Sequence, residues 1–360
     1  MNRFLNRSFT ISAILAFSLA FVSCGGSKKK EDNGIIVPPV EADRVVYVAG
    51  VEYHNIFSLH GYPVVWKNGT AQRLTSIATG NENNGAVAYS IFVSGDAVYV
   101  AGESTQNVYG PSAPIYTANL WVDGVPRELS GGTSASSVFV SGSDVYVAGR
   151  NDSGPVVWKN GTPQALVGGR SANSVFVSGS DVYVGGIRRR TTDSVIDDGV
   201  IWKNGTVLYT LVNDEDERNR TYVSSIYVSG SDVYAAGYVL GRNTNSNLIG
   251  KARLWKNGNV QTLDVGDQDS SANSVAVSGN DVYVAGMGGA GMQSAMLWKN
   301  GVAQRLGGNG EAKSVFVFGG DVYVCGEDFD GEMSRATVWK NGTIYQRMAR
   351  GAAVYSIFVK

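Results

Sequence analysis

One pattern of hydrophobic and polar residues, here called the block, recurs along most of the chain. The clearest copy, at 137–149, reads Ser-Val-Phe-Val-Ser-Gly-Ser-Asp-Val-Tyr-Val-Ala-Gly, and a second phrase follows it, such as Leu-Trp-Lys-Asn-Gly at 254–258. Runs like Val-Phe-Val and Val-Tyr-Val are apolar at every position, which is typical of strands covered on both faces. Ser-Gly-Ser-Asp and Asn-Gly are tight-turn sequences. With a third segment such as Gln261–Leu263, each block predicts four short antiparallel strands.

The block occurs seven times, and its tryptophans recur on average about every 45 residues between Trp66 and Trp339. Repeats of this length with four strands each predict a β-propeller. The first copy, at 43–50, lacks its first strand, whereas the chain ends on a first strand at 356–360. We therefore predict an all-β, seven-bladed β-propeller with four antiparallel strands per blade, closed by the C-terminal strand joining the N-terminal blade.

The Val-Tyr-Val-Ala-Gly and Trp-Lys-Asn-Gly phrases resemble those of bacterial seven-bladed propeller-repeat lipoproteins. The resemblance extends from Asp43 to Lys360. It implies a fold and a location. Members of this kind share no one activity, so no mechanism follows from it.

The N-terminus has the pattern of an export signal. Arg3 and Arg7 precede an apolar run at 11–22, which is about the length of a signal-peptide core and short for a membrane span. The sequence Phe-Val-Ser-Cys-Gly at 21–25 resembles the lipobox of bacterial lipoproteins, which implies cleavage before Cys24 and lipidation of its thiol and amine. An ordinary secretory peptide with an incidental cysteine is the alternative.

These features divide the chain into three parts. Residues 1–23 are the expected signal peptide, 24–42 a lipidated flexible tether, and 43–360 the propeller. The expected location is the cell envelope, with the anchor in the outer membrane, and Lys-Glu-Asp at 30–32 resembles a signal for surface exposure in lipoproteins of the Bacteroidetes type. A net charge of −1 excludes a nucleic-acid partner bound through bulk positive charge. The expected partners are the membrane and an extracellular glycan or protein.

Antiparallel topology puts the uniform turns at one end of the blades and the variable connections at the other, where binding is expected. Two rings of side chains should line that variable end. Residues just before each first strand form the first ring: Tyr89, Ser136, Asn173, Ser224, Asn273, Lys313 and Tyr355. Residues just after the glycine of each second strand form the second ring: Val51, Glu103, Arg150, Ile187, Tyr238, Met287 and Glu327.

From these rings we take Tyr89, Asn173, Asn273, Lys313, Tyr355, Arg150 and Tyr238 as candidate ligand-binding residues. The leading hypothesis is a lipid-anchored, non-enzymatic binding scaffold for glycan or protein. The alternative is a carbohydrate-active enzyme, a glycoside hydrolase or polysaccharide lyase, with Glu103 and Glu327 as the candidate carboxylates. A purely structural envelope protein is a third option.

Other motifs point to no cofactor. His54 and His60 lie in one predicted loop without a third ligand at metal spacing, so we expect no zinc site. The segments 264–269 and 328–332 are acidic like calcium loops but lack the full series of ligands, which leaves calcium as an open alternative. Cys325 occupies the alanine position of a repeat and predicts a buried, inert thiol.

Overall fold

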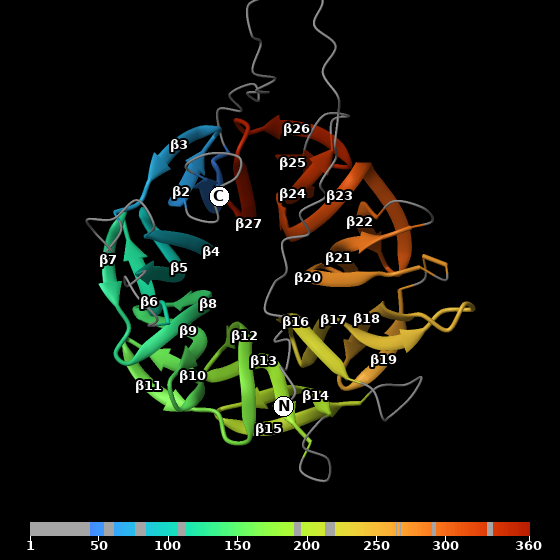
Figure 1. Cartoon of the computed structure of the whole chain (residues 1–360), viewed down its shortest axis with the longest axis horizontal. Coiled ribbons are helices and arrows are strands. Elements are labelled where there is room, and N and C mark those ends of the chain that lie inside the picture. Colours follow the sequence, from blue (N-terminus) through green and yellow to red (C-terminus); the bar gives the residue numbers. More distant parts are fainter. Residues whose placement is uncertain are drawn as a thin grey trace, which may run out of the picture. The chain divides into compact units, whose positions relative to one another are not determined.

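Antiparallel sheets stand like blades around a common axis, with the chain running from sheet to sheet around the ring (Figure 1). The computed structural model describes residues 44–360 except 54–60, 76–83, 107–112, 191–195, 213–219, 264, 267, 290–292 and 330–333. All regular structure in these residues is β. Within the same ranges, no helix is long and apolar enough to cross a membrane.

The strands fall into four layers from the axis outwards. The innermost are β4 (Gly85–Ser94), β8 (Gly132–Ser141), β12 (Gly169–Ser178), β16 (Thr221–Ser229), β20 (Ser271–Ser278), β23 (Val302–Phe318) and β27 (Ala352–Val359). The second layer holds β1 (Val46–Tyr53), β5 (Ala97–Gln106), β9 (Asp144–Asn151), β13 (Asp181–Arg189), β17 (Asp232–Arg242), β21 (Asp281–Gly288) and β24 (Asp321–Phe329). The third holds β2 (Gly61–Lys67), β6 (Ile115–Val122), β10 (Gly154–Lys159), β14 (Asp197–Lys203), β18 (Leu248–Lys256), β22 (Ser294–Lys299) and β25 (Ser334–Lys340). The outer strands are β3 (Thr70–Arg73), β7 (Val125–Glu128), β11 (Thr162–Ala165), β15 (Thr206–Leu211), β19 (Asn259–Thr262) and β26 (Thr343–Arg347).

Five sheets have four strands, and a sixth has seven because β23 is continuous. Residues 302–305 of β23 pair with β22 as an outer strand, and residues 310–318 pair with β24 as an innermost strand. The repeats predicted seven separate sheets, whereas the structure has six. The β-propeller architecture itself is confirmed.

The predicted closure is confirmed by strand pairing. β27 pairs antiparallel with β1, and Phe358 lies opposite Tyr47 in this register. Two further backbone hydrogen bonds join Val45 and Lys360 at the end of the pair. The last strand of the chain is therefore the innermost strand of the first sheet, which leaves no open edge between the two ends of the ring.

A cycle of hydrogen bonds joins the seven innermost strands. The hydroxyl of Ser90 accepts a hydrogen bond from the amide of Val138 on the next strand, at 3.1 Å. The same contact recurs at each neighbouring pair, and Ser356 returns the cycle to the amide of Ile91. The serine that opens each predicted first strand is therefore a link between blades.

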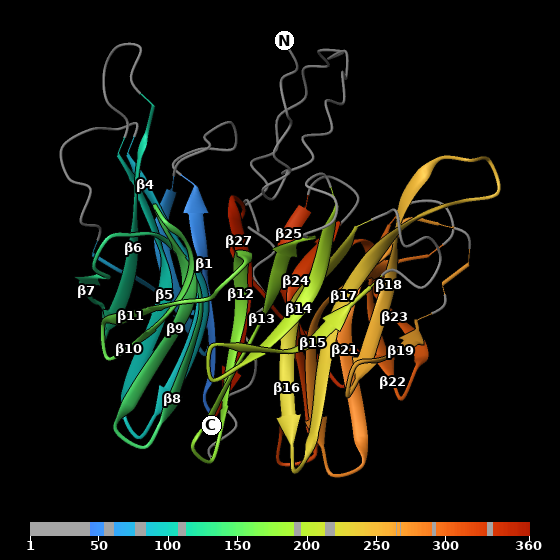
Figure 2. The ribbon, with the colours of Figure 1, turned by 90° about the horizontal axis from the view of Figure 1, so that it is seen from below.

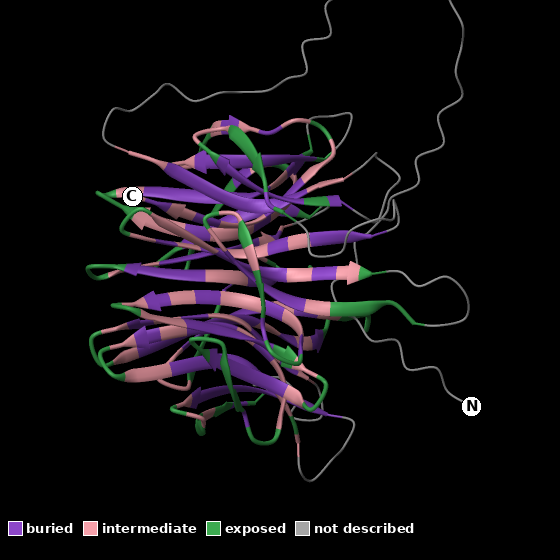
Figure 3. Ribbon diagram, turned by 90° about the vertical axis from the view of Figure 1, so that its left-hand side faces the viewer, coloured by how far each residue is buried: buried purple, intermediate pink, exposed green. Residues whose placement is uncertain are grey.

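The apolar core lies between adjacent sheets, where side chains of neighbouring blades form shared clusters. Long stretches of the strands are accordingly buried (Figure 3). Each third-layer tryptophan packs with the apolar residue at or just after the end of the preceding outer strand segment. Trp121 packs with Leu74, and Trp158 packs with Leu129. Trp66 packs with Met348, so the first and last sheets share a core like any other pair.

Tight turns form one end of the ring, here called the lower face (Figure 2). Asn160 and Gly161 both have positive φ, 52° and 82°, as a type I′ turn requires. The Asn160 side chain also accepts a hydrogen bond from the amide of Val145 at 2.8 Å, and thereby ties two turns of one sheet together. The opposite end, here called the upper face, carries the connections that vary among the repeats.

Candidate functional site

The seven residues predicted as the first ring lie within the innermost strands. We expected them just before each strand, but the strands begin earlier than the repeats suggested. Each of these residues is the extra residue of a β-bulge, as at Tyr89, where the register passes from Ala88–Gly102 to Ser90–Ala101. A bulge turns a side chain out of the regular alternation. The fold itself therefore sets the orientation of these seven side chains.

The bulge explains why the Val-Tyr-Val-Ala-Gly phrase ends in glycine. Its glycine lies opposite the bulge, where a carbonyl of the innermost strand turns towards the second strand. A Cβ on Gly149 would lie 2.1 Å from the carbonyl oxygen of Ser134, and one on Gly102 would lie 1.9 Å from that of Val87. No side chain fits at such a distance, so the position requires glycine.

Three tyrosines and two glutamates form what we call the tyrosine cluster: Tyr53, Tyr89, Tyr355, Glu103 and Glu327. The Tyr89 hydroxyl donates a 2.9 Å hydrogen bond to the Glu103 carboxylate. The rings of Tyr89 and Tyr355 meet edge to face with centroids 5.6 Å apart. Tyr53 interacts with Tyr355 through their hydroxyl groups, and the Glu327 charge acts on both. The sheet closed by β27 therefore supplies Tyr53 and Tyr355. They lie between Glu103 of one neighbouring sheet and Glu327 of the other.

Burial dominates the electrostatics of this cluster. It raises the pKa of Glu103, and contacts with Ser134 and Tyr89 only partly offset that rise. It also raises the pKa of Tyr89 and Tyr355, and the nearby Glu103 and Tyr53 respectively add to the effect. The tyrosines are therefore neutral hydrogen-bonding groups at physiological pH, and Glu103 holds its proton more readily than an exposed glutamate.

Lys313 and Asn273 lie on the Glu327 side of the cluster. The Lys313 ammonium forms an ion pair with Glu311, and the Asn273 amide donates to the same carboxylate at 2.8 Å and to the carbonyl of Ala312 at 2.9 Å. Glu327 accepts a 3.0 Å hydrogen bond from Ser334. The Glu327 side of the tyrosine cluster is therefore polar, and its side chains bond to one another.

The remaining predicted residues lie apart from the tyrosine cluster. Asn173 donates to the carbonyl of Val223 at 2.6 Å, so its amide joins two blades. Arg150 is exposed and donates to the carbonyl of Arg170 at 2.9 Å. Tyr238 stacks on Tyr222 with centroids 4.6 Å apart. Each of these three residues bonds to or stacks on a residue outside the tyrosine cluster, so the predicted ring divides into separate groups.

An arginine–aspartate group on the upper face was not predicted. Arg170 binds both carboxylate oxygens of Asp197, at 3.0 and 2.9 Å, and Arg190 pairs with Asp198. Both aspartates are buried at the start of β14. Their adjacency in Asp-Asp-Gly, directly before an apolar strand, is the sequence signal that could have indicated them.

Tyr53 was also missed, although the sequence held a signal for it. Strand alternation places it on the same face as Val51, a member of the predicted second ring. Burial raises the pKa of Cys325 well above its ordinary range, which agrees with the predicted inert thiol. Cys24, His54, His60 and the calcium-like residues Asp264, Asp267, Asp330 and Glu332 lie outside the described residues.

The described part of the calcium-like segments is bonded within the protein. Asp328 pairs with Arg347 and accepts the amide of Gly308 at 3.0 Å, while Asp269 accepts from Gly250 and Gln293. Among the described residues, no group of three or more His, Cys, Asp or Glu side chains could hold a metal ion.

No family model and no curated protein matches the chain. Among solved structures, it is similar to the β-propeller domain of the Trilobed protease from Pyrococcus furiosus, with 12% identity, a TM-score of 0.49, and coverage of 87% of this chain and 96% of that one. It is also similar to Pyrococcus horikoshii acylaminoacyl peptidase, with 12% identity, a TM-score of 0.47, and coverage of 72% and 46%. A third is Trypanosoma rangeli sialidase, with 10% identity, a TM-score of 0.40, and coverage of 91% and 54%. These similarities carry no information about the activity of this chain.

Proposed function

We propose that this protein binds carbohydrate on its upper face through the tyrosine cluster. The observation that carries the proposal is the convergence of Tyr53, Tyr89 and Tyr355 between Glu103 and Glu327. All five side chains are half-buried, so they are held in place yet open to a ligand. Tyr89 and Tyr355 both stand at bulges, on the innermost strands β4 and β27 of adjacent sheets.

The chemistry of the cluster matches a sugar. A pyranose has an apolar C–H face that packs on aromatic rings, and its hydroxyls pair with carboxylates and phenols. Tyr89 and Glu103 already form one donor–acceptor pair that a sugar hydroxyl can join. Lys313 and Asn273 extend the polar surface towards Glu311.

Glycoside hydrolysis is a second candidate, favoured by the environment of Glu103. Burial raises its pKa, and a carboxyl group with a raised pKa is the usual general acid of such enzymes. Glu327, on the other side of the tyrosines, would then be the second carboxylate. Hydrolysis would need both groups to reach one glycosidic bond.

The proposed setting is the cell envelope. Lipidation at Cys24, expected from the lipobox resemblance, would anchor the chain to a membrane, and the tether would carry the propeller away from it. In that setting the upper face would meet extracellular or envelope glycans.

A glycan array probed with the full chain tests the proposal, followed by calorimetry with the best ligand. We expect Tyr89→Phe and Tyr355→Phe each to weaken binding several-fold, because each removes a hydroxyl that can bond to the sugar. Glu103→Gln should weaken it about tenfold, because an amide accepts a weaker hydrogen bond than a carboxylate. Tyr146→Phe, which removes a hydroxyl near the lower face, is the matched control and should bind normally. Absence of any glycan ligand, or an equal loss in Tyr146→Phe, would refute carbohydrate binding.

Release of reducing sugar from the bound glycan distinguishes the two candidates. An enzyme should lose this activity in Glu103→Gln and Glu327→Gln even at glycan concentrations that saturate both variants. A binding protein should release nothing in any form.

A further inference from the structure

Six aromatic side chains form an incomplete ring on the innermost strands, nearer the lower face than the tyrosine cluster. Each stands three residues after a bulge residue, as Phe92 does after Tyr89. Neighbouring rings tilt against one another with centroids 4.7–5.0 Å apart. In order around the axis they are Tyr227, Phe176, Phe139, Phe92, Phe358 and Phe316.

The seventh position is Ala276, on β20 between Tyr227 and Phe316. Its pairing with Tyr283 is equivalent to that of Phe92 with Tyr99, so the missing aromatic is a substitution in an otherwise regular repeat. Ala276 is 7% exposed and packs near Tyr227. The aromatic chain therefore stops at Tyr227 and at Phe316, and we call the position of the small Ala276 side chain between them the gap.

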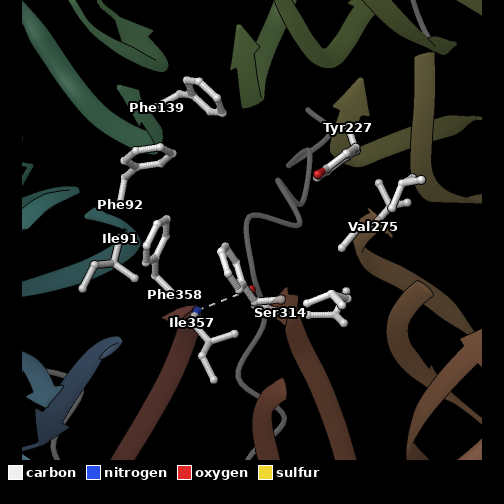
Figure 4. A pocket seen from close by; sticks show the side chains of 13 residues that line it. Ile91, Phe92, Phe139, Tyr227, Val275, Ser314, Ile357 and Phe358 are labelled. Carbon is white, nitrogen blue, oxygen red and sulfur yellow. Dashed lines mark hydrogen bonds between the residues drawn. The ribbon is translucent and has the colours of Figure 1, made fainter. Parts of the chain in front are cut away.

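A cavity of about 180 Å³ adjoins this gap (Figure 4). Its walls include Tyr227, Ala276, Phe316 and Phe358, and none of the described residues lining it is charged. The hydroxyl of Ser314, another side chain of the lining, accepts the amide of Ile357 at 3.4 Å within the serine cycle. The Tyr227 hydroxyl points towards the space between the rings (Figure 4), and burial alone raises its pKa.

We propose that this cavity binds a small neutral aromatic molecule of the phenol class. Its ring would take the place of the seventh aromatic beside Ala276, in the tilted geometry of the other six. Its hydroxyl would pair with that of Tyr227, the polar group of the wall that the serine cycle does not use. A cavity of about 150 Å³ with apolar walls is known to bind benzene, so the volume here suits one ring. A charged ligand would lose its hydration without a partner.

This site is independent of the proposed carbohydrate site, since it uses different residues of the innermost strands. The direct test is ¹⁹F NMR titration of the full chain with 4-fluorophenol. We expect saturable binding with a Kd of about 1 mM or lower. Ala276→Phe should fill the gap and weaken binding at least tenfold, whereas Ala71→Phe, the same change on the exposed outer strand β3, should leave it unchanged.

Two comparisons define the ligand class. Tyr227→Phe should weaken 4-fluorophenol binding several-fold but leave fluorobenzene binding as it is, since only the phenol uses the hydroxyl. Cyclohexanol, which has a similar size and no aromatic ring, should compete poorly.

The proposal is overturned if 4-fluorophenol does not bind, if Ala276→Phe binds it as the natural chain does, or if cyclohexanol competes equally. Should Ala276→Phe fail to fold, Ala276→Leu narrows the same gap with a smaller side chain, and it carries the same expectation.

Discussion

Deletion of residues 352–360 is expected to abolish the folded monomer. These residues form β27, whose Val354, Ile357 and Val359 are at most 3% exposed in the core shared by the first and last sheets. Burial of each such side chain stabilises by about 1.5–3 kcal/mol, so their combined loss is comparable with the whole stability of a typical domain, about 5–15 kcal/mol. The deletion also exposes the edge of β1 and breaks the serine cycle at Ser314 and Ser356.

Circular dichroism, urea unfolding and size-exclusion chromatography measure this effect. The truncated chain should show no cooperative unfolding transition and should aggregate through the open edge. Lys360→Ala is the control, because it keeps β27 and removes only a surface contact with Gly95 and Asp96. A synthetic peptide of residues 352–360 should restore part of the folded state. A truncated chain that unfolds cooperatively at the normal urea concentration would contradict closure by β27.

Gly149→Ala is expected to destabilise the protein by about 3 kcal/mol, the upper end of the usual cost of overpacking. The new methyl group would meet the backbone carbonyl of Ser134 at 2.1 Å, and that carbonyl cannot move without loss of the bulge. The result would be a lower urea midpoint at an unchanged m-value.

Gly142→Ala is the matched control for this prediction. Gly142 has a φ of 60° in the turn between β8 and β9, but its Cβ position is open within 4 Å. Only the conformational cost of about 1 kcal/mol is expected there. If the two substitutions cost the same, the glycine of the repeat is not needed by the bulge.

The repeat phrases predicted the architecture because their signals are local. Asn-Gly fixes a type I′ turn through positive φ, and continuous β-branched runs fix buried strands, so neither depends on distant residues. Closure was predictable because Tyr47 belongs to a second strand that lacks its first strand, whereas Phe358 belongs to a first strand that lacks its second. The bulge was not predictable, since it depends on how two strands pair. The continuity of β23 escaped prediction for the same reason.

The candidate site could be predicted only in part. Strand register predicted that Tyr89, Tyr355 and Glu103 lie at one end of the ring. It could not predict which of them are in contact. Tyr53 joins the cluster through the closing sheet, which brings together residues about 300 positions apart in the chain. Asn173 and Asn273 lie within the innermost strands rather than just before them, and their amides bond to neighbouring blades. Such contacts depend on side-chain conformation, which a repeat pattern does not encode.

A disulfide between β27 and β1 is the most direct test of the closed ring. Glu52 and Ala352 are paired residues of these strands, so a Glu52→Cys/Ala352→Cys chain, with Cys24 and Cys325 changed to serine, should oxidise readily. Mass spectrometry should find one intramolecular link between positions 52 and 352 in the monomer, formed faster than in a Glu52→Cys/Thr343→Cys control. Links only between molecules, or no faster oxidation than in the control, would contradict a ring closed by its two ends.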